Sequence, residues 1–136
     1  MQANKPVHIY LAEDNLDHRE LIEDMLEDSH LPFKLFHAPN GLALLDLLSC
    51  NPAPADLILL DIKMPKMGGL ETLSRLRTLD HLNSTPIVII TTSTIKSDIS
   101  KATSLGATQF LTKPLSFSDI KPYINRDGES HAHSFD

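Results

Sequence analysis

The chain has 136 residues, of which 41% are hydrophobic and 22% are charged, values typical of one globular domain. The formal net charge of −6, with no lysine- or arginine-rich stretch, argues against direct nucleic-acid binding. The only cysteine, Cys50, excludes an internal disulfide and fits a reducing compartment. The first apolar run ends at Glu13, too early for a signal peptide, and no later run could span a membrane. We therefore expect a soluble cytoplasmic protein that does not bind membranes.

Short apolar segments alternate with amphipathic segments along the whole chain. The apolar segments are typical of strands and comprise residues 7–12, 33–37, 56–61, 86–91 and 107–112. The third of them is wholly apolar between Asp56 and Asp61, which is expected of a central strand buried on both faces. Each strand is followed by a segment with helical periodicity.

The ends of the predicted helices carry recognisable capping residues. Asn15 or Asp14 can cap the first helix, and Gly106 ends the fourth. In the third helix, Glu71 is placed to pair with Arg75 one turn later. The fifth helix contains Pro122, which removes a helical hydrogen bond, so we expect this helix to be short or kinked.

This alternation predicts an α/β fold with a doubly wound, five-stranded parallel sheet of the flavodoxin-like (βα)5 type. The expected strand order is 2-1-3-4-5, with the switch point between the first and third strands. The domain is predicted to span residues 7–125. Residues 126–136 are polar and lack periodicity, so we predict a flexible C-terminal tail.

Charged and hydroxyl side chains stand at the ends of four predicted strands: Glu13, Asp14, Asp61, Thr91 and Lys113. The carboxyl ends of parallel strands meet at one edge of the sheet, where open α/β sheets bind ligands. Neighbouring carboxylates repel one another unless a divalent cation joins them. A hydroxyl and an ammonium suit an anion such as a phosphoryl group. The pattern predicts magnesium-assisted phosphoryl chemistry.

Four motifs carry a family resemblance that extends over residues 7–124. They are Leu-Ala-Glu-Asp-Asn (11–15), Leu-Ile-Leu-Leu-Asp-Ile-Lys-Met-Pro-Lys-Met-Gly-Gly (57–69), Pro-Ile-Val-Ile-Ile-Thr-Thr-Ser (86–93) and Gly-Ala-Thr-Gln-Phe-Leu-Thr-Lys-Pro (106–114). Each motif alone is weak. In this order and register they resemble the receiver domain of two-component response regulators, in particular the chemotaxis Y-type group.

The resemblance implies a metal-dependent phosphoacceptor site. Asp61 would be the phosphoacceptor. Asp14 and Asp61 would coordinate Mg²⁺ (or Mn²⁺), with Glu13 helping directly or through water, and the backbone carbonyl of Lys63 would supply another ligand.

The resemblance also implies a switch. Thr91 would bond a phosphoryl oxygen and shift toward it on activation, and Lys113 would pair with Asp61 or with the phosphoryl group. The bond between Lys113 and Pro114 is expected to be cis. Phe110 matches the switch aromatic of the family, although core packing explains an aromatic residue here equally well.

The function implied is that of a single-domain response regulator in a phosphorelay. A histidine kinase or a histidine phosphotransfer protein would supply the phosphoryl group. The domain would promote its own phosphorylation and dephosphorylation rather than act as an enzyme on a separate substrate. Output would pass to an unknown downstream protein, through a face built from the fourth helix, fifth strand and fifth helix.

Three residues depart from the family pattern. Thr92 stands where a small alanine is common, Pro122 interrupts the last helix, and Lys63 is a basic residue two positions after the acceptor. Lys63 can reach over the acceptor and slow the attacking water, or bind the phosphoryl group. Ser93, two residues after Thr91, would face the same space. We predict that Lys63 and Ser93 set the lifetime of the phosphoaspartate.

Other functions fit the sequence less well. A phosphatase of the haloacid dehalogenase group needs a second aspartate where Lys63 stands. In a flavin-binding flavodoxin-like protein, Glu13 and Asp14 would repel the flavin phosphate, and no P-loop motif is present. A pseudo-receiver that only binds partners remains an alternative.

The histidines add no metal motif. His18 and His37 have no ligand spacing, and neither do the other histidines before residue 126. His131 and His133 are spaced like a metal pair, but we interpret them as solvated residues of the tail.

Overall fold

The computed structural model describes residues 5–50, 54–92 and 95–124. Strands and helices alternate along these residues, as the sequence predicts. In chain order they are β1 (Val7–Ala12), α1 (Leu16–Asp28), β2 (Phe33–Ala38), α2 (Gly41–Cys50), β3 (Leu57–Asp61), α3 (Gly69–Leu76), the 3₁₀ helix η2 (Asp80–Leu82), β4 (Ile87–Thr91), α4 (Lys96–Ser104), β5 (Gln109–Thr112) and α5 (Phe117–Ile124). Ser93 and residues 126–136, for which we made predictions, lie outside the described residues.

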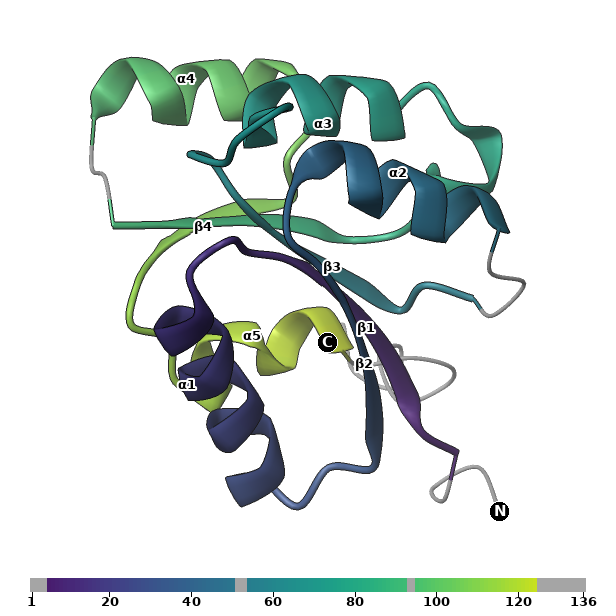
Figure 1. The fold of residues 1–136 in the computed structure, drawn as a ribbon, viewed down its shortest axis with the longest axis vertical. Coiled ribbons are helices and arrows are strands. Elements are labelled where there is room, and N and C mark those ends of the chain that lie inside the picture. The colour runs from purple at the N-terminus through teal and green to yellow at the C-terminus, as the bar shows by residue number, and fades with distance from the viewer. Residues whose placement is uncertain (1–4, 51–53, 93–94, 125–136) are drawn as a thin grey trace, which may run out of the picture.

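The strands form one parallel sheet in the order β2-β1-β3-β4-β5. Figure 1 shows α2, α3 and α4 above this sheet and α1 and α5 below it. The predicted doubly wound fold and its strand order are therefore confirmed. After β1 the chain continues to β2 on one side, and after β3 it continues to β4 on the other side. The loops that follow β1 and β3 therefore diverge at the carboxyl edge of the sheet.

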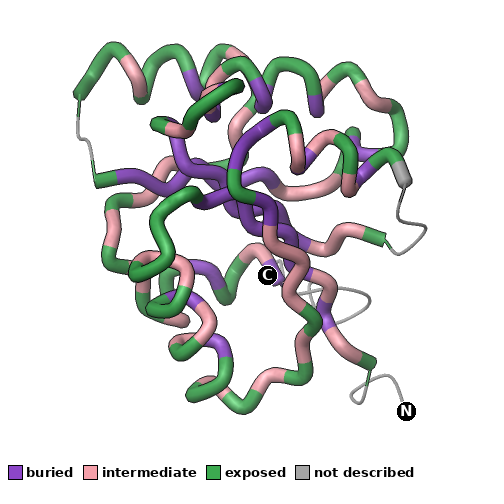
Figure 2. Tube along the Cα trace, viewed as in Figure 1, coloured by how far each residue is buried: buried purple, intermediate pink, exposed green. Residues whose placement is uncertain are grey.

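Side chains of the central strands alternate between two hydrophobic clusters, one on each face of the sheet. Ile58 and Leu60 of β3 pack toward the side of α2, α3 and α4, whereas Leu57 and Leu59 pack toward α1 and α5. Every residue of β3 and β4 is buried, and the tube in Figure 2 is purple through the middle of the sheet. Burial on both faces explains why these segments read as continuous apolar runs in the sequence.

The edge strands differ slightly from the sequence prediction. The fifth strand begins at Gln109 rather than at Ala107, because the N–H of Ala107 donates to Ala102 O at 2.9 Å and so still belongs to the turn that ends α4. Gly106 in this turn has φ +99°, a conformation that favours glycine. The second strand extends one residue further than predicted, to Ala38.

The helix ends follow the predicted chemistry in part. Asn15 caps α1 by accepting the N–H of His18 on its side chain at 3.0 Å. Glu71 and Arg75 form the predicted pair at 3.1 Å on the exposed face of α3. α5 has 8 residues and contains Pro122, which agrees with the predicted short helix. Within the described residues, no helix is long and apolar enough to cross a membrane.

Arg77 connects, by hydrogen bonds, the segments that enter β4 and β5 at the amino end of the sheet. Nε of Arg77 donates to Gly106 O, and Nη1 donates to Leu82 O and Thr85 O, each at 2.9 Å. Nη2 lies 3.3 Å from Oγ1 of Thr108. One side chain thus ties the segment before β4 to the segment before β5.

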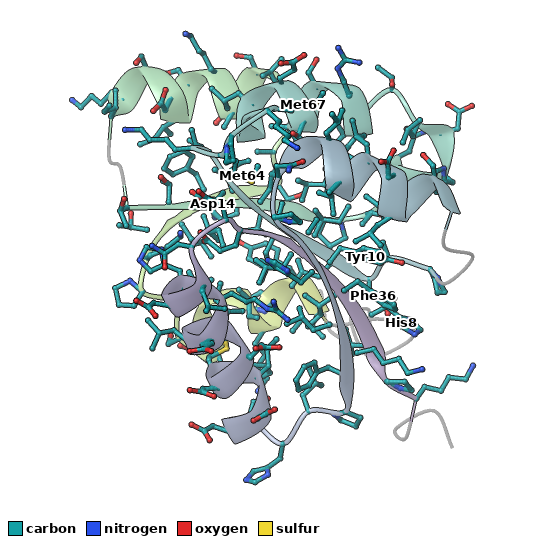
Figure 3. The ribbon with its side chains drawn as sticks, viewed as in Figure 1. His8, Tyr10, Asp14, Phe36, Met64 and Met67 are labelled. Carbon is teal, nitrogen blue, oxygen red and sulfur yellow. The ribbon has the colours of Figure 1, made fainter. Side chains whose placement is uncertain are left out.

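Aromatic rings line the face of β1 and β2 that packs under α2. Tyr10 stacks on Phe36 with ring centroids 4.6 Å apart, and the ring of His8 lies 5.8 Å from that of Phe36 (Figure 3). Figure 3 also shows that Asp14 lies at the opposite end of β1 from His8. The aromatic row therefore stabilises the sheet away from the charged edge.

Candidate functional site

The carboxyl edge of the sheet brings together the polar residues that follow different strands. Glu13 comes after β1, Asp61 ends β3, Thr91 ends β4 and Lys113 comes after β5. Each of Glu13, Asp61 and Lys113 stands two positions after a residue of the hydrophobic cluster on the α1 and α5 side of the sheet. Because side chains alternate along a strand, these three are directed to the same side of the sheet.

Three carboxylates form the acidic part of the site. Glu13, Asp14 and Asp61 each offer an oxygen atom, and these atoms all lie within 4.8 Å of one another. Glu13 is 1% exposed and Asp61 is 7% exposed, whereas Asp14 is exposed to solvent. Burial, and then the charge of Glu13, raise the pKa of the Asp61 carboxyl, and Lys113 acts in the opposite direction. Clustered carboxylate oxygens with such mutual repulsion fit the ligand preference of a hard divalent cation.

Lys113 supplies the positive charge opposite these carboxylates. Its Nζ lies 2.5 Å from Oε1 of Glu13 and 3.3 Å from Oδ2 of Asp61, and its side chain is only 8% exposed. The family resemblance implies that Lys113 pairs with Asp61 or with the phosphoryl group, and the structure adds a shorter pair with Glu13. Glu13 is therefore both a potential metal ligand and the main anchor of the lysine.

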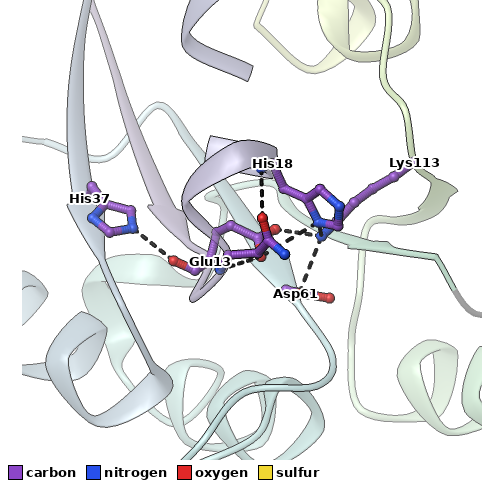
Figure 4. A network of polar contacts seen from close by, with 6 residues as sticks. Glu13, His18, His37, Asp61 and Lys113 are labelled. Atoms are coloured by element: carbon purple, nitrogen blue, oxygen red, sulfur yellow. Dashed lines mark hydrogen bonds and ion pairs between the residues drawn. The ribbon is translucent and has the colours of Figure 1, made fainter. Parts of the chain in front are cut away.

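The backbone around Glu13 is held firmly in place. Its N–H donates to Ala38 O at 3.0 Å, and His37 Nε2 donates to its carbonyl at 2.7 Å. The N–H of Asn15 donates to Oε2 of the Glu13 carboxylate at 3.1 Å. With Lys113 on Oε1, both carboxylate oxygens have a partner, so the carboxylate has a fixed orientation (Figure 4).

Two histidines belong to this network, and sequence reasoning missed both. His18 Nδ1 lies 3.0 Å from Lys113 Nζ and 3.9 Å from Oε2 of Glu13, and His37 contacts the Glu13 carbonyl (Figure 4). Neither has a spacing that predicts a site. The signal available for His18 was its position three residues after the capping Asn15, in the helix that leaves the switch point.

The other predicted site residues differ in how they relate to this centre. Thr91 is 2% exposed, and its carbonyl accepts the N–H of Lys113 at 2.8 Å. The peptide bond from Lys113 to Pro114 is cis. Lys63 is exposed in the loop after β3. Phe110 is partly buried and packs against the cluster on the side of α2, α3 and α4.

The loop after β3 passes very close to the backbone of the candidate acceptor. The N–H of Gly69 donates to Ile62 O at 2.8 Å. A Cβ atom at Gly69 would stand 2.1 Å from the carbonyl oxygen of Asp61 and 2.8 Å from Cα of Ile62. Only glycine allows α3 to begin this close to the backbone of Asp61.

Comparison with known proteins identifies the family. The model of the response regulator receiver domain matches residues 9–125. A curated relative, the probable methanogenesis regulatory protein FilR2 of Methanothrix harundinacea, is 34% identical over 125 residues, which cover 89% of this chain and 81% of the relative.

Solved structures agree with this match. The phosphorylated cyanobacterial phytochrome response regulator RcpA has a TM-score of 0.77 and 27% identity, with 96% of each chain covered. The Mn²⁺-bound form of the response regulator Rcp1 has a TM-score of 0.75 and 30% identity, covering 92% of this chain and 93% of Rcp1. Receiver domains bind a divalent metal and receive phosphoryl groups from histidine kinases or phosphotransfer proteins. The chain belongs to the response regulator receiver domain family of two-component signalling.

Proposed function

We propose that Asp61 accepts a phosphoryl group from a histidine kinase or a histidine phosphotransfer protein. The observation that carries this proposal is the position of the Asp61 carboxylate, 3.3 Å from the Lys113 ammonium and next to the oxygens of Glu13 and Asp14. A carboxylate becomes an effective nucleophile toward phosphorus when it is aligned and its charge is compensated. Lys113 places a positive charge beside Asp61, and a divalent cation held by the carboxylates would add the rest of the compensating charge.

The metal would be held by residues of two segments, one after β1 and one at the end of β3. Asp14 and Asp61 are the proposed direct ligands of Mg²⁺ (or Mn²⁺), with Glu13 acting directly or through water and the backbone carbonyl of Lys63 completing the protein ligands. When bound, the cation neutralises charge on the phosphoryl oxygens and on the carboxylates. The Mn²⁺-bound form of the related Rcp1 supports a divalent cation at such a site.

The proposed transfer is an in-line displacement on the donor phosphorus. A carboxylate oxygen of Asp61 forms the new bond to phosphorus, while the bond from phosphorus to the donor imidazole nitrogen breaks and the electron pair leaves with that nitrogen. Lys113 pairs with one phosphoryl oxygen, and the hydroxyl of Thr91 donates to another. The protein positions the groups and compensates charge, and the phosphorylated relative RcpA supports this chemistry.

The phosphorylated state would be read by another protein. We propose that Thr91 shifts toward the phosphoryl group and that Phe110 responds on the neighbouring strand, so that phosphorylation biases a two-state equilibrium. The output face would comprise α4, β5 and α5. Ile95, which immediately precedes α4, and Ile99 on α4 are 52% and 37% exposed, which suits a protein partner at this face.

The lifetime of the phosphoaspartate would depend on Lys63 and Ser93. Lys63 is exposed in the loop after β3, two residues after Asp61, where we expect its side chain to approach the phosphoryl group or the attacking water. We expect Lys63→Ala and Ser93→Ala to change the dephosphorylation rate of the isolated domain. Unchanged rates in both variants would contradict this part of the proposal.

Intact mass spectrometry tests the central proposal. The protein is incubated with acetyl phosphate in the presence of MgCl₂ or of EDTA, alongside Asp61→Asn. A matched control is Asp46→Asn, which neutralises an exposed aspartate on α2. One added phosphoryl group that requires both the metal and Asp61 is the expected result. No addition, together with no Mg²⁺ binding by calorimetry, would support a pseudo-receiver that only binds partners.

A further inference from the structure

The ammonium group of Lys113 has an acceptor for each of its N–H bonds. The distances from Nζ are 2.5 Å to Glu13 Oε1, 3.0 Å to His18 Nδ1 and 3.3 Å to Asp61 Oδ2. The three acceptors come from the loop after β1, from α1 and from the end of β3 (Figure 4). The contact with the candidate phosphoacceptor is the longest of the three.

The chemistry of the two groups settles which atom donates between Lys113 and His18. An ammonium has donors only, so Nδ1 of His18 must accept, and the neutral ring then carries its proton on Nε2. A neutral acceptor orients the ammonium without adding another negative charge to compete with Asp61. His18 therefore differs from Glu13, which attracts the ammonium by charge.

The local backbone holds His18 and Glu13 in a fixed relation. Asn15 accepts the N–H of His18 on its side chain at 3.0 Å, and its own N–H donates to the Glu13 carboxylate at 3.1 Å. One capping residue thus positions the first turn of α1 and the glutamate together. The Glu13 carboxylate and the ring of His18, whose backbone Asn15 anchors, both face the end of the Lys113 side chain.

Near His18, the ammonium of Lys113 has few other hydrogen-bond acceptors within reach. His18, Thr92 and Lys113 border a pocket of about 360 Å³ whose other lining residues are apolar, among them Leu21, Ile22 and Leu115. A lysine N–H directed at such a wall would lose hydrogen-bond energy. The side chain of Lys113 is 8% exposed, so water compensates little for a missing acceptor.

We infer that His18 is a positioning residue for Lys113. Glu13 and His18 each accept a hydrogen bond from the ammonium, so its third N–H bond is directed at Asp61. After phosphorylation, this N–H can donate to a phosphoryl oxygen in place of the carboxylate. This inference rests on the proposed function of Asp61 as phosphoacceptor. Nothing in the family motifs carries it, since His18 lies outside all four.

Two substitutions at His18 separate positioning from packing. His18→Asn keeps an acceptor oxygen near the position of Nδ1, whereas His18→Leu keeps bulk and removes the acceptor. Leu21→Ala is the matched control, since it trims the same pocket from the same helix without touching Lys113 by a polar contact. Phosphorylation is followed by intact mass at saturating MgCl₂ and several concentrations of acetyl phosphate, and Mg²⁺ affinity is measured by calorimetry.

A positioning role predicts a specific pattern. His18→Leu lowers the maximal phosphorylation rate about threefold to tenfold, the range expected for loss of one neutral hydrogen bond. Its Mg²⁺ affinity stays within about twofold of wild type, because every proposed metal ligand is retained. His18→Asn recovers most of the rate, and Leu21→Ala leaves it unchanged. Equal rates for His18→Leu and wild type, or equal losses in His18→Leu and Leu21→Ala, would overturn the inference.

Nitrogen NMR of the wild-type protein tests the contact without any substitution. Because Nδ1 of His18 accepts from the ammonium, long-range ¹H–¹⁵N spectra should show a proton on Nε2 of His18 and none on Nδ1. A proton on Nδ1 would overturn the inference. If wild-type protein is not phosphorylated at all, the proposed function fails, and the tautomer still decides whether His18 accepts from Lys113.

Discussion

Glu13 and Lys113 are 100 residues apart in the sequence, and Oε1 and Nζ of these residues lie 2.5 Å apart. The Glu13 side chain is fully buried and that of Lys113 is 8% exposed. β1 and β5 are not neighbours in the sheet, so this ion pair joins two loops across the ends of β3 and β4. Removal of either charge would leave the other poorly compensated in a dry environment.

Lys113→Met should destabilise the metal-free protein and increase its response to magnesium. The variant leaves the carboxylates of Glu13 and Asp61 without the ammonium group that they share. We expect a loss of about 3 kcal/mol in the free energy of unfolding, the range for a broken buried ion pair. Thermal unfolding in EDTA and in saturating MgCl₂ measures both effects. Because the cation supplies the missing charge, the stabilisation by Mg²⁺ should exceed that of wild type, and an equal or smaller stabilisation would refute this account.

Asp61→Asn should stabilise the metal-free protein at neutral pH. Burial and the charge of Glu13 raise the pKa of Asp61, so ionised Asp61 opposes folding and its protonated form does not. The penalty is present at about pH 7 and fades as the pH falls toward about 4, the ordinary range of a carboxyl pKa. Urea unfolding in EDTA at the two pH values should therefore show a stability advantage of the variant only at the higher pH. An advantage that is independent of pH would show that ionisation of Asp61 is not its cause.

Arg77→Met should destabilise the protein strongly, whereas Arg75→Met should have little effect. Arg77 donates to three backbone carbonyls at 2.9 Å each, and the variant leaves these carbonyls without that partner. We expect a loss of about 2–4 kcal/mol in the free energy of unfolding. Arg75→Met removes only an exposed pair with Glu71 and should cost less than about 0.5 kcal/mol. Chemical denaturation of both variants makes the comparison, and similar losses would contradict the fastening role of Arg77.

Gly69→Ala should disturb the acceptor site through the backbone. The added Cβ would meet the Asp61 carbonyl oxygen at 2.1 Å, so either α3 or the end of β3 must move. We expect a loss of about 2 kcal/mol in stability, typical of overpacking, and slower phosphorylation of Asp61. Gly68→Ala is the control, because its Cβ would come no closer than 3.2 Å to Ile62 O. Equal phosphorylation rates of the two variants would exclude the close approach at Gly69 as a determinant of the site.

The sequence predicts the sheet well because burial on both faces leaves a direct signature. β3 and β4 are continuous apolar runs, and the structure places both at the centre of the sheet. Boundaries are less certain at the edge. The start of β5 depends on the hydrogen bond between Ala107 and Ala102, a choice between helix turn and strand that side-chain pattern does not report.

The sequence by itself determined which residues stand at the strand ends, because each strand is a short apolar run that stops at a polar residue, and alternation with helices makes the strands parallel. Those rules suffice to bring Asp61 and Lys113 to one edge of the sheet. Only the tertiary structure decided how the ammonium is shared, since that depends on side-chain directions and on the path of the loop after β1. The shorter pair of Lys113 with Glu13 and its hydrogen bond with His18 join positions 100 and 95 residues apart, and no local pattern encodes such contacts.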